Sequence, residues 1–460
     1  MGTPFNRIAE RDAQDAQRAF LDRFIAGKED IVTFVANRLG WSQAGEFLHY
    51  HIGPFNVSIS VANTITQQHV LIRFPIPGKV YGPWQVQKVR NEVMVLEYIA
   101  QETSIPVPQV LAWGSSEESP QHLGPFIIEE FMEGKNLVDL LRQPFDDIED
   151  VPILDPDIDD TKLDFVYEQI AGFQLQLSRL GFKSIGAISS IKGFDGSVVT
   201  DAPPLTYDMN EVVAFAGFPA DHFDSATAYS RATDYFSERA RCLQLNLETH
   251  RNVGQEEADL TWKRYVARHC LEKLVPAYCP AAEDHGPFRL FCDNLRPANM
   301  LVDPDTMRIT AVLDLEFTNA LPAQYAYDVP WWLILRNPAV FVGEEGKQQL
   351  LDLFEPRKEQ YIRAMERAEA KFPQLVPAEE PRLSARVRDS WDSGRFWFNL
   401  SMRSSFDADE VYWNFLYREG RGEAMLDQAT LAAKEEFLRK KKSQFDAYYE
   451  EKRADARFEI

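Results

Sequence analysis

Cysteine and long apolar runs are both scarce in this sequence. The 460 residues include four cysteines, none in a CxxC pair or at a zinc-binding spacing. This pattern predicts neither a disulfide framework nor a structural zinc site. No apolar run reaches transmembrane length, and the opening residues MGTPFNRIAERDAQDAQRAF lack the apolar core of a secretory signal peptide. We therefore expect a reduced, cytoplasmic protein that does not bind membranes.

Basic residues are also fewer than acidic ones. The chain has 49 Lys and Arg against 71 Asp and Glu, a formal net charge of −22. This balance argues against nucleic acid or an anionic membrane as a partner. Hydrophobic residues make up 45% of the chain and aromatic residues 12%, enough for a large buried core. At this length, two lobes or domains are the natural expectation.

The periodicity of apolar residues divides the chain into three parts. Residues 1–40 predict an N-terminal helical extension. Residues 41–133 are rich in short strand patterns, such as NVSISVAN and HVLIRFP, and include one helical pattern, KVRNEVMVLEYIAQET. Residues 134–460 read as mainly helical, with an apolar stripe in FVYEQIAGFQLQLSRL. The sequence therefore predicts an α+β fold with a small strand-rich part and a larger helical part.

The segment NMLVDPDTMRITAVLDLEF is the most informative. MLV and RITAVLDL read as strands and DPDT as a turn, which predicts an antiparallel hairpin. Asn299 begins the first strand and Asp314 ends the second, so the hairpin brings the two side chains to one end. An amide and a carboxylate held there, together with substrate phosphates, suit a magnesium ion. Alternatively, both side chains satisfy backbone groups at the hairpin end.

Two further features lie in the strand-rich part. Glu92 interrupts the apolar stripe of its helix, where a carboxylate needs a partner, and Arg73 in the preceding strand is the natural candidate. This pair could hold a phosphate through the guanidinium, or be purely structural. The turn GPFN, with Phe55 at its third position, could lean over phosphates, or be an ordinary turn between strands.

Taken in order, these pieces resemble a known family. VLIRFPIPG, VRNEV, FIIEEFMEG, LRPANMLVD and ITAVLDLEFTNALP are similar to motifs of the aminoglycoside phosphotransferase and choline kinase branch of the protein-kinase-like fold. The fungal proteins that carry this domain are the most similar, and the resemblance covers residues 45–420. It implies a two-lobed protein-kinase-like fold with a small antiparallel-sheet N-lobe that includes one helix, and a large, mainly helical C-lobe.

The resemblance also implies site residues. Arg73 stands where a Lys usually contacts nucleotide phosphates, and Glu92 at the helix position that orients it. FIIEEFMEG matches the hinge, whose backbone would hold adenine near Glu130 to Met132. Asn299 and Asp314 match the magnesium ligands. Two further matches are the acid Glu316, which follows the metal ligand, and Asp328, which braces the catalytic loop in the family.

The catalytic loop departs from the family pattern His-Gly-Asp-Leu-x-x-x-Asn. Alignment on Leu295 and Asn299 places Asn294 at the catalytic Asp and Asp293 one position earlier. Asn holds a hydroxyl but is no useful base, so a rate loss of about 10²- to 10⁴-fold is expected. Asp293 could substitute only if the loop turns it inward, which the sequence does not decide.

The leading hypothesis is an ATP- and magnesium-dependent phosphotransferase that acts on a hydroxyl of a small molecule. The alternatives are a pseudokinase-like binding protein and a cleft converted to non-phosphoryl biosynthetic chemistry, both favoured by Asn294. The resemblance places the acceptor pocket in the helical lobe. If its aromatic residues line the pocket and are not core, an amine-bearing or partly apolar acceptor is favoured. These residues are Trp331, Trp332, Trp391, Phe396 and Trp397.

Overall fold

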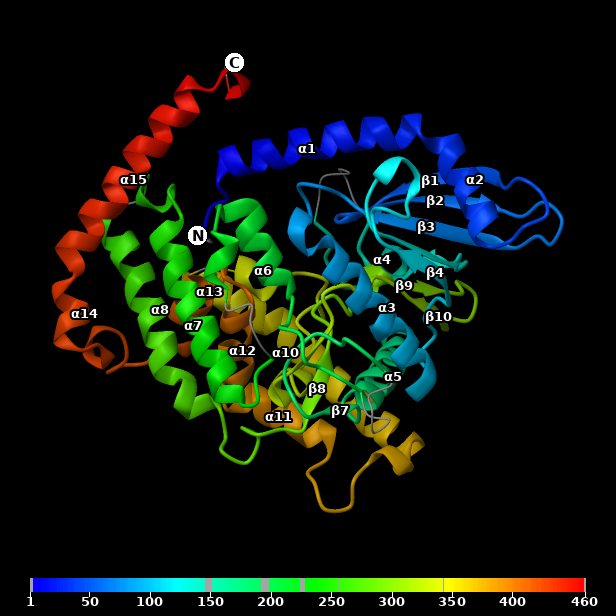
Figure 1. Cartoon of the computed structure of the whole chain (residues 1–460). Helices are drawn as coiled ribbons and strands as arrows, with labels where there is room; N and C mark the ends of the chain where they lie inside the picture. The colour runs from blue at the N-terminus through cyan, green and yellow to red at the C-terminus, as the bar shows by residue number, and fades with distance from the viewer. Residues whose placement is uncertain are drawn as a thin grey trace.

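The N-lobe is built on one antiparallel sheet. The computed structural model describes residues 3–144, 151–191, 198–223, 228–255, 257–341 and 343–458. Val57, Ile59 and Val61 of β2 share one face of the sheet and are buried, and the intervening Ser58 and Ser60 are buried on the other face. The five strands lie in the order β1-β2-β3-β5-β4 (Figure 1). Their bounds are β1 Glu46–Ile52, β2 Asn56–Ala62, β3 His69–Pro75, β4 Val110–Gly114 and β5 Phe126–Glu130.

Helices cover both faces of this sheet. α1 (Arg7–Ala26) and α2 (Lys28–Arg38) place Phe24 and Val35 in one hydrophobic cluster with the sheet residue Phe74. α3 (Gln85–Glu102) supplies a separate cluster on the opposite side, where its valines meet Ile127 of β5. The predicted helical extension is therefore part of the N-lobe core.

The C-lobe is mainly helical and contains the largest hydrophobic cluster. It also holds two small sheets, with strand orders β10-β9-β6 and β11-β8-β7. The strands are β6 Lys135–Asn136, β7 Gly181–Phe182, β8 Phe288–Phe291, β9 Met300–Val302, β10 Ile309–Val312 and β11 Asn319–Leu321. The helices are α4 Leu137–Leu141, α5 Asp160–Leu177, α6 Tyr207–Glu211, α7 Ala232–Thr249, α8 Ala258–Tyr278, α9 Ala323–Ala326, α10 Gly343–Lys371, α11 Leu383–Asp392, α12 Arg395–Arg403, α13 Ala408–Val411, α14 Gln428–Ala432 and α15 Lys434–Ala454.

This architecture confirms the predicted α+β fold with two lobes. α1 runs along the molecule from the helical side to the sheet, so the two lobes share this helix (Figure 1). Among the described residues, no helix combines the length and apolarity needed to cross a bilayer. The division at residues 40 and 133 stays a prediction.

Candidate active site

The predicted hairpin is present and joins Asn299 to Asp314. Met300 pairs with Val312, and the Leu313 amide donates to the carbonyl of Asn299 at 2.8 Å. The turn between β9 and β10 is stabilised by the Asp303 side chain, which accepts hydrogen bonds from two turn amides. The sequence prediction that these two side chains share one end of a hairpin is therefore confirmed.

Asp314 sits in a strained and crowded position. Its φ is +59°, a left-handed conformation that Asp adopts more readily than most residues. One carboxylate oxygen accepts a hydrogen bond from the Asn294 amide nitrogen at 3.0 Å, and the other lies 3.9 Å from Arg73 Nη1. Burial raises the pKa of Asp314 well above its usual range, and the nearby carboxyls of Glu316 and Glu92 raise it further. An ionised Asp314 therefore needs more positive charge than Arg73 alone supplies.

Asn294 faces the hairpin end rather than standing free in the loop. Its amide nitrogen donates to Asp314, and its backbone carbonyl accepts a hydrogen bond from Asn299 Nδ2 at 2.9 Å. Because the Asn299 side-chain nitrogen is used in this second bond, its side-chain oxygen, Oδ1, is the atom that remains available to bind a metal. The residue that the family resemblance places at the catalytic-base position thus donates a hydrogen bond to the predicted metal ligand.

The predicted ion pair in the N-lobe is confirmed. Arg73 Nη2 lies 2.8 Å from Glu92 Oε1, and both side chains are buried. Glu129 of β5, which the sequence analysis missed, lies 3.0 Å from Arg73 Nε. Although burial lowers the pKa of Arg73, Glu129, Glu92 and Asp314 raise it above its usual range. Arg73 is therefore a permanently charged centre surrounded by three carboxyl groups.

A second buried cation, Lys88, was also missed. It forms an ion pair with Glu316, lies 3.8 Å from Glu92 Oε2, and donates to Asn56 Oδ1 at 3.2 Å. Asn56 in turn donates to Glu316 Oε2 at 2.9 Å. The spacing of Lys88 four residues before Glu92 on one helix was the available signal.

These groups form one buried charge cluster, which we call the cleft cluster. It comprises two cations and four carboxyl groups, Arg73, Lys88, Glu92, Glu129, Asp314 and Glu316. Full ionisation leaves it two charges negative. Among the described residues, no group donates a hydrogen bond to the buried Glu316 Oε1, so the cluster also has an unsatisfied acceptor. Such a cluster is completed by a divalent cation or by protons.

A cavity of about 520 Å³ lies between the lobes and opens onto this cluster. Of the residues predicted to bind nucleotide or metal, Arg73, Glu130, Met132, Asn299 and Asp314 line it. Glu92 lies behind Arg73 and does not line it.

Phe55 is placed differently from the other predicted nucleotide-binding residues. Its ring is buried and packs edge-on against Tyr207 and Phe317. Its neighbours Gly53, Pro54 and Asn56 line the inter-lobe cavity instead. A contact from residue 55 to a nucleotide would therefore involve its backbone, and the role assigned to it stays a prediction.

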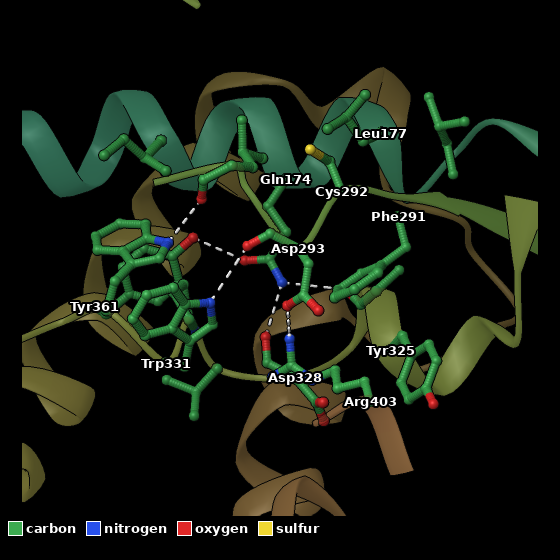
Figure 2. Close-up of a pocket in the computed structure, with 17 residues that line it drawn as sticks. Gln174, Leu177, Phe291, Cys292, Asp293, Tyr325, Asp328, Trp331, Tyr361 and Arg403 are labelled. Atoms are coloured by element: carbon green, nitrogen blue, oxygen red, sulfur yellow. Dashed lines mark hydrogen bonds and ion pairs between the residues drawn. The ribbon is translucent and has the colours of Figure 1, made fainter. Parts of the chain in front are cut away.

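Asp293, predicted as an alternative base, pairs with Arg403 and not with Asp314. Its carboxylate forms an ion pair with Arg403, whose guanidinium also lies 5.3 Å from the Phe291 ring (Figure 2). Burial raises the pKa of Asp293, whereas Arg403 lowers it, and the balance stays above the usual value. The loop thus turns Asp293 toward an arginine and Asn294 toward Asp314.

A small cavity of about 70 Å³ lies behind the loop, and its wall explains how the loop is fixed (Figure 2). Trp331 Nε1 donates to the carbonyl of Asp293 at 3.3 Å, and Trp332 Nε1 to that of Leu295 at 2.7 Å. Asp328, expected to brace the loop, instead accepts hydrogen bonds from Ser390 and Asn399. Two indole groups therefore take the bracing role.

The other aromatic candidates belong to the core. Trp391 stacks on Phe354 with ring centroids 5.1 Å apart, and Phe396 and Trp397 pack against Trp391. Of the five candidates, Trp331 lines a second cavity, which we call the acceptor-side cavity because the family resemblance predicts an acceptor pocket in the helical lobe.

This acceptor-side cavity has a volume of about 320 Å³. Asp293 and Asn294 form part of its wall, and α6 and the segment after α12 supply further carboxyl groups. Burial raises the pKa of Glu211 to about 8, and Asp208 adds to the effect. The remaining lining residues are Phe5, Tyr207, Arg296, Trp331, Asn337, Leu400, Arg403, Ser404, Phe406 and Asp407.

Replacement of Glu211 by Gln is expected to stabilise the protein increasingly as the pH rises from about 5 to above 8. A carboxyl whose folded pKa of about 8 exceeds its ordinary value of 4.5 favours folding while protonated, and this contribution is lost progressively as the pH rises from the ordinary pKa through the folded pKa. Gln stays neutral, so Glu211→Gln should gain about 1–2 kcal/mol at pH 8.5, discounted for partial solvent access, and about zero at pH 5. Thermal unfolding at both pH values measures this, with the exposed Glu345→Gln as the matched control. Equal shifts at both pH values would contradict the prediction.

Comparisons with known proteins give partial matches to one set of curated relatives. No protein-family model matches the sequence. The mitochondrial protein Altered inheritance of mitochondria protein 9 of Debaryomyces hansenii is 30% identical over 334 residues, 64% of this chain and 49% of the relative. Its namesake in Scheffersomyces stipitis is 27% identical over 153 residues, 33% of this chain and 22% of that protein. The chain thus spans about half or less of the curated relatives that it matches.

Solved structures of small-molecule kinases are similar over most of the chain. Aminoglycoside phosphotransferase APH(4)-Ia, in complex with AMP-PNP and hygromycin B, covers 92% of this chain and 99% of its own, with a TM-score of 0.41 and 14% identity. The match to Plasmodium vivax ethanolamine kinase covers 88% of this chain and 82% of the kinase chain, with a TM-score of 0.38 and 13% identity. Within this chain, the small antiparallel-sheet lobe and the mainly helical lobe form a two-lobed α+β fold.

The expected cytoplasmic location is contradicted by the curated relatives, which are named as mitochondrial proteins. Few cysteines and the absence of a secretory-type apolar run are features that cytoplasmic and mitochondrial proteins share, so they could not separate the two compartments.

Proposed function

We propose that this protein binds a magnesium nucleotide in the inter-lobe cavity and transfers a phosphoryl group, slowly, to a hydroxyl of a small molecule. The observation that carries the proposal is the cleft cluster. Arg73 Nη2 pairs with Glu92 Oε1 at 2.8 Å, and Arg73 Nη1 lies 3.9 Å from Asp314 Oδ1. This arrangement presents a fixed guanidinium for phosphate beside a carboxylate for metal.

The residues present fit a magnesium ion. Asn299 and Asp314 would supply a side-chain amide oxygen and a carboxylate at one end of the hairpin, and the excess negative charge of the cleft cluster favours a divalent cation. Within the described ranges no group of three or more His, Cys, Asp or Glu forms a metal site, so phosphates and water would complete the coordination. When bound, magnesium would neutralise charge on the transferring phosphoryl group.

The catalytic loop explains why we propose slow transfer. Asn294 cannot accept the proton of the acceptor hydroxyl, and its amide is already bonded to Asp314. Asp293 is paired with Arg403. Positioning and charge stabilisation remain, and they supply most of the catalysis in phosphoryl transfer.

The acceptor-side cavity supports an amine-bearing, partly apolar acceptor. Glu211 and Asp407 provide carboxyl groups, and Trp331 and Phe406 provide apolar walls beside Asn294. A cationic amine would meet the carboxyl groups, whereas its hydroxyl would lie toward the loop.

A second candidate is nucleotide binding without transfer. The Asn294–Asp314 hydrogen bond favours it, because the loop then stabilises the ligand site and supplies no base. The relatives named as mitochondrial support a mitochondrial location for either function.

Thermal unfolding with ATP, with and without magnesium, tests the binding step, and turnover across a library of amino alcohols tests transfer. Stabilisation by ATP only in the presence of magnesium supports the site. No stabilisation under either condition would refute both candidates, whereas stabilisation without turnover would select the second.

A further inference from the structure

Phe5, in the segment 3–6 that precedes α1, lines the acceptor-side cavity. The Thr3 amide donates to the carbonyl of Phe406 at 2.9 Å, and the Asn6 amide to that of Phe215 at 2.7 Å. Between them, the carbonyl of Phe5 accepts a hydrogen bond from Asn252 Nδ2 at 2.9 Å. The C-lobe therefore fixes the backbone on both sides of Phe5.

Thr3 anchors this segment in a buried ionic cluster. Its hydroxyl accepts hydrogen bonds from Arg264 and Arg268 at 3.2 and 3.3 Å and lies 3.3 Å from an Asp409 oxygen. Arg268 and Asp409 are themselves a buried ion pair. The segment is held by polar contacts that a loosely attached terminus would not make.

The Phe5 ring is packed on one side and open on the other. It meets the Phe406 ring edge-on at 4.7 Å and the Phe215 ring at 5.3 Å. It nevertheless keeps 38% of its surface exposed, and it lines the cavity together with Asp293 and Asn294. A fixed aromatic face beside a catalytic loop is a contact surface for an apolar part of a ligand.

The far end of α1 belongs to the N-lobe. Phe24 lies in the core of the N-lobe sheet, and Ala13 packs so closely on Gly78 that a Cβ at residue 78 would lie 2.3 Å from the Ala13 carbonyl oxygen. α1 therefore reaches from the C-lobe to the N-lobe (Figure 1). Contacts with both lobes set the position of Phe5.

We propose that residues 3–6 form a wall of the acceptor pocket and that Phe5 selects acceptors that carry an aryl group. The proposal rests on the acceptor role proposed above for this cavity. The aryl group packs on the open face of Phe5 between Phe406 and Trp331, and the carboxyl groups of Glu211 and Asp407 serve the amine.

The test compares two amino alcohols that differ in one substituent, 2-amino-1-phenylethanol and 1-amino-2-propanol, by ligand-observed NMR titration of the full chain. Burial of a phenyl group removes more apolar surface from water than burial of a methyl group, so the wild type should bind the phenyl compound at least about 10-fold more tightly. Phe5→Ala should reduce this ratio to about 2-fold, and Phe5→Leu, which keeps apolar packing, to an intermediate value. Asn252→Ala, which releases the Phe5 backbone but keeps the ring, should also lower it.

Phe165→Ala is the matched control, because Phe165 is an exposed Phe on α5 outside the cavity. The ratio of the two affinities in Phe165→Ala should equal that of the wild type. An unchanged ratio in Phe5→Ala overturns the proposal, and so does a wild type without preference for the phenyl compound.

ATP with magnesium is added to the same samples to separate this inference from the proposed function. Stabilisation by magnesium ATP in Phe5→Ala, together with lost selectivity, supports the role of Phe5. If magnesium ATP stabilises Phe5→Ala against thermal unfolding but the affinity ratio is unchanged, the role of Phe5 alone is refuted. If ATP does not stabilise the wild type, the proposed function is refuted.

Discussion

Asp314→Ala is expected to abolish the magnesium-dependent stabilisation of this protein by ATP. Loss of the carboxylate at the hairpin end removes the proposed metal ligand, and changes around metal sites weaken binding by about 10- to 100-fold even when they act indirectly. We therefore expect nucleotide affinity in the presence of magnesium to fall by about 100-fold or more. Isothermal titration with ATP, with and without magnesium, measures the effect.

The same variant should keep or gain stability without ligand. Burial and neighbouring carboxyls raise the pKa of Asp314, so its ionised form is unfavourable in the cleft cluster. A binding residue that destabilises the folded state is a known feature of functional sites. Asp305→Ala, an exposed Asp in the same hairpin, is the matched control. If ATP stabilises wild type and Asp314→Ala equally, the metal assignment is wrong.

Asn294→Asp is expected to raise phosphotransfer or ATP hydrolysis by about 100-fold or more. The change is nearly isosteric and supplies the carboxylate that can accept the proton of the acceptor hydroxyl. It also replaces the 3.0 Å hydrogen bond to Asp314 with two facing carboxylates. Without magnesium the variant should therefore be about 1–3 kcal/mol less stable at neutral pH, and magnesium ATP should recover much of this loss.

Asn294→Ala is the control for this result, because it removes the amide without adding a base and should not raise the rate. Asp293→Asn separates the two loop residues. It breaks the ion pair with Arg403 and should lower stability, while the rate per nucleotide-bound molecule changes little. A wild type that is fully active, and whose rate neither Asn294→Asp nor Asp293→Asn alters, would show that neither residue is the base.

The sequence by itself determined the local parts of this site. Turn residues and strand alternation place Asn299 and Asp314 at one hairpin end, because pairing in a short hairpin depends on neighbours in the chain. A carboxylate inside an apolar helical stripe requires a cation, which identified Glu92 and its partner Arg73. The alternating and helical patterns likewise gave the two-part α+β organisation.

The tertiary structure alone decided which way the loop residues face. Asp293 pairs with Arg403, 110 positions away, and Phe5 reaches the same cavity from before the first helix. Glu129 joins Arg73 because two strands pair, and no local pattern marks that contact. The direction of a loop side chain depends on the charges that the fold brings to it, and those charges come from distant parts of the chain.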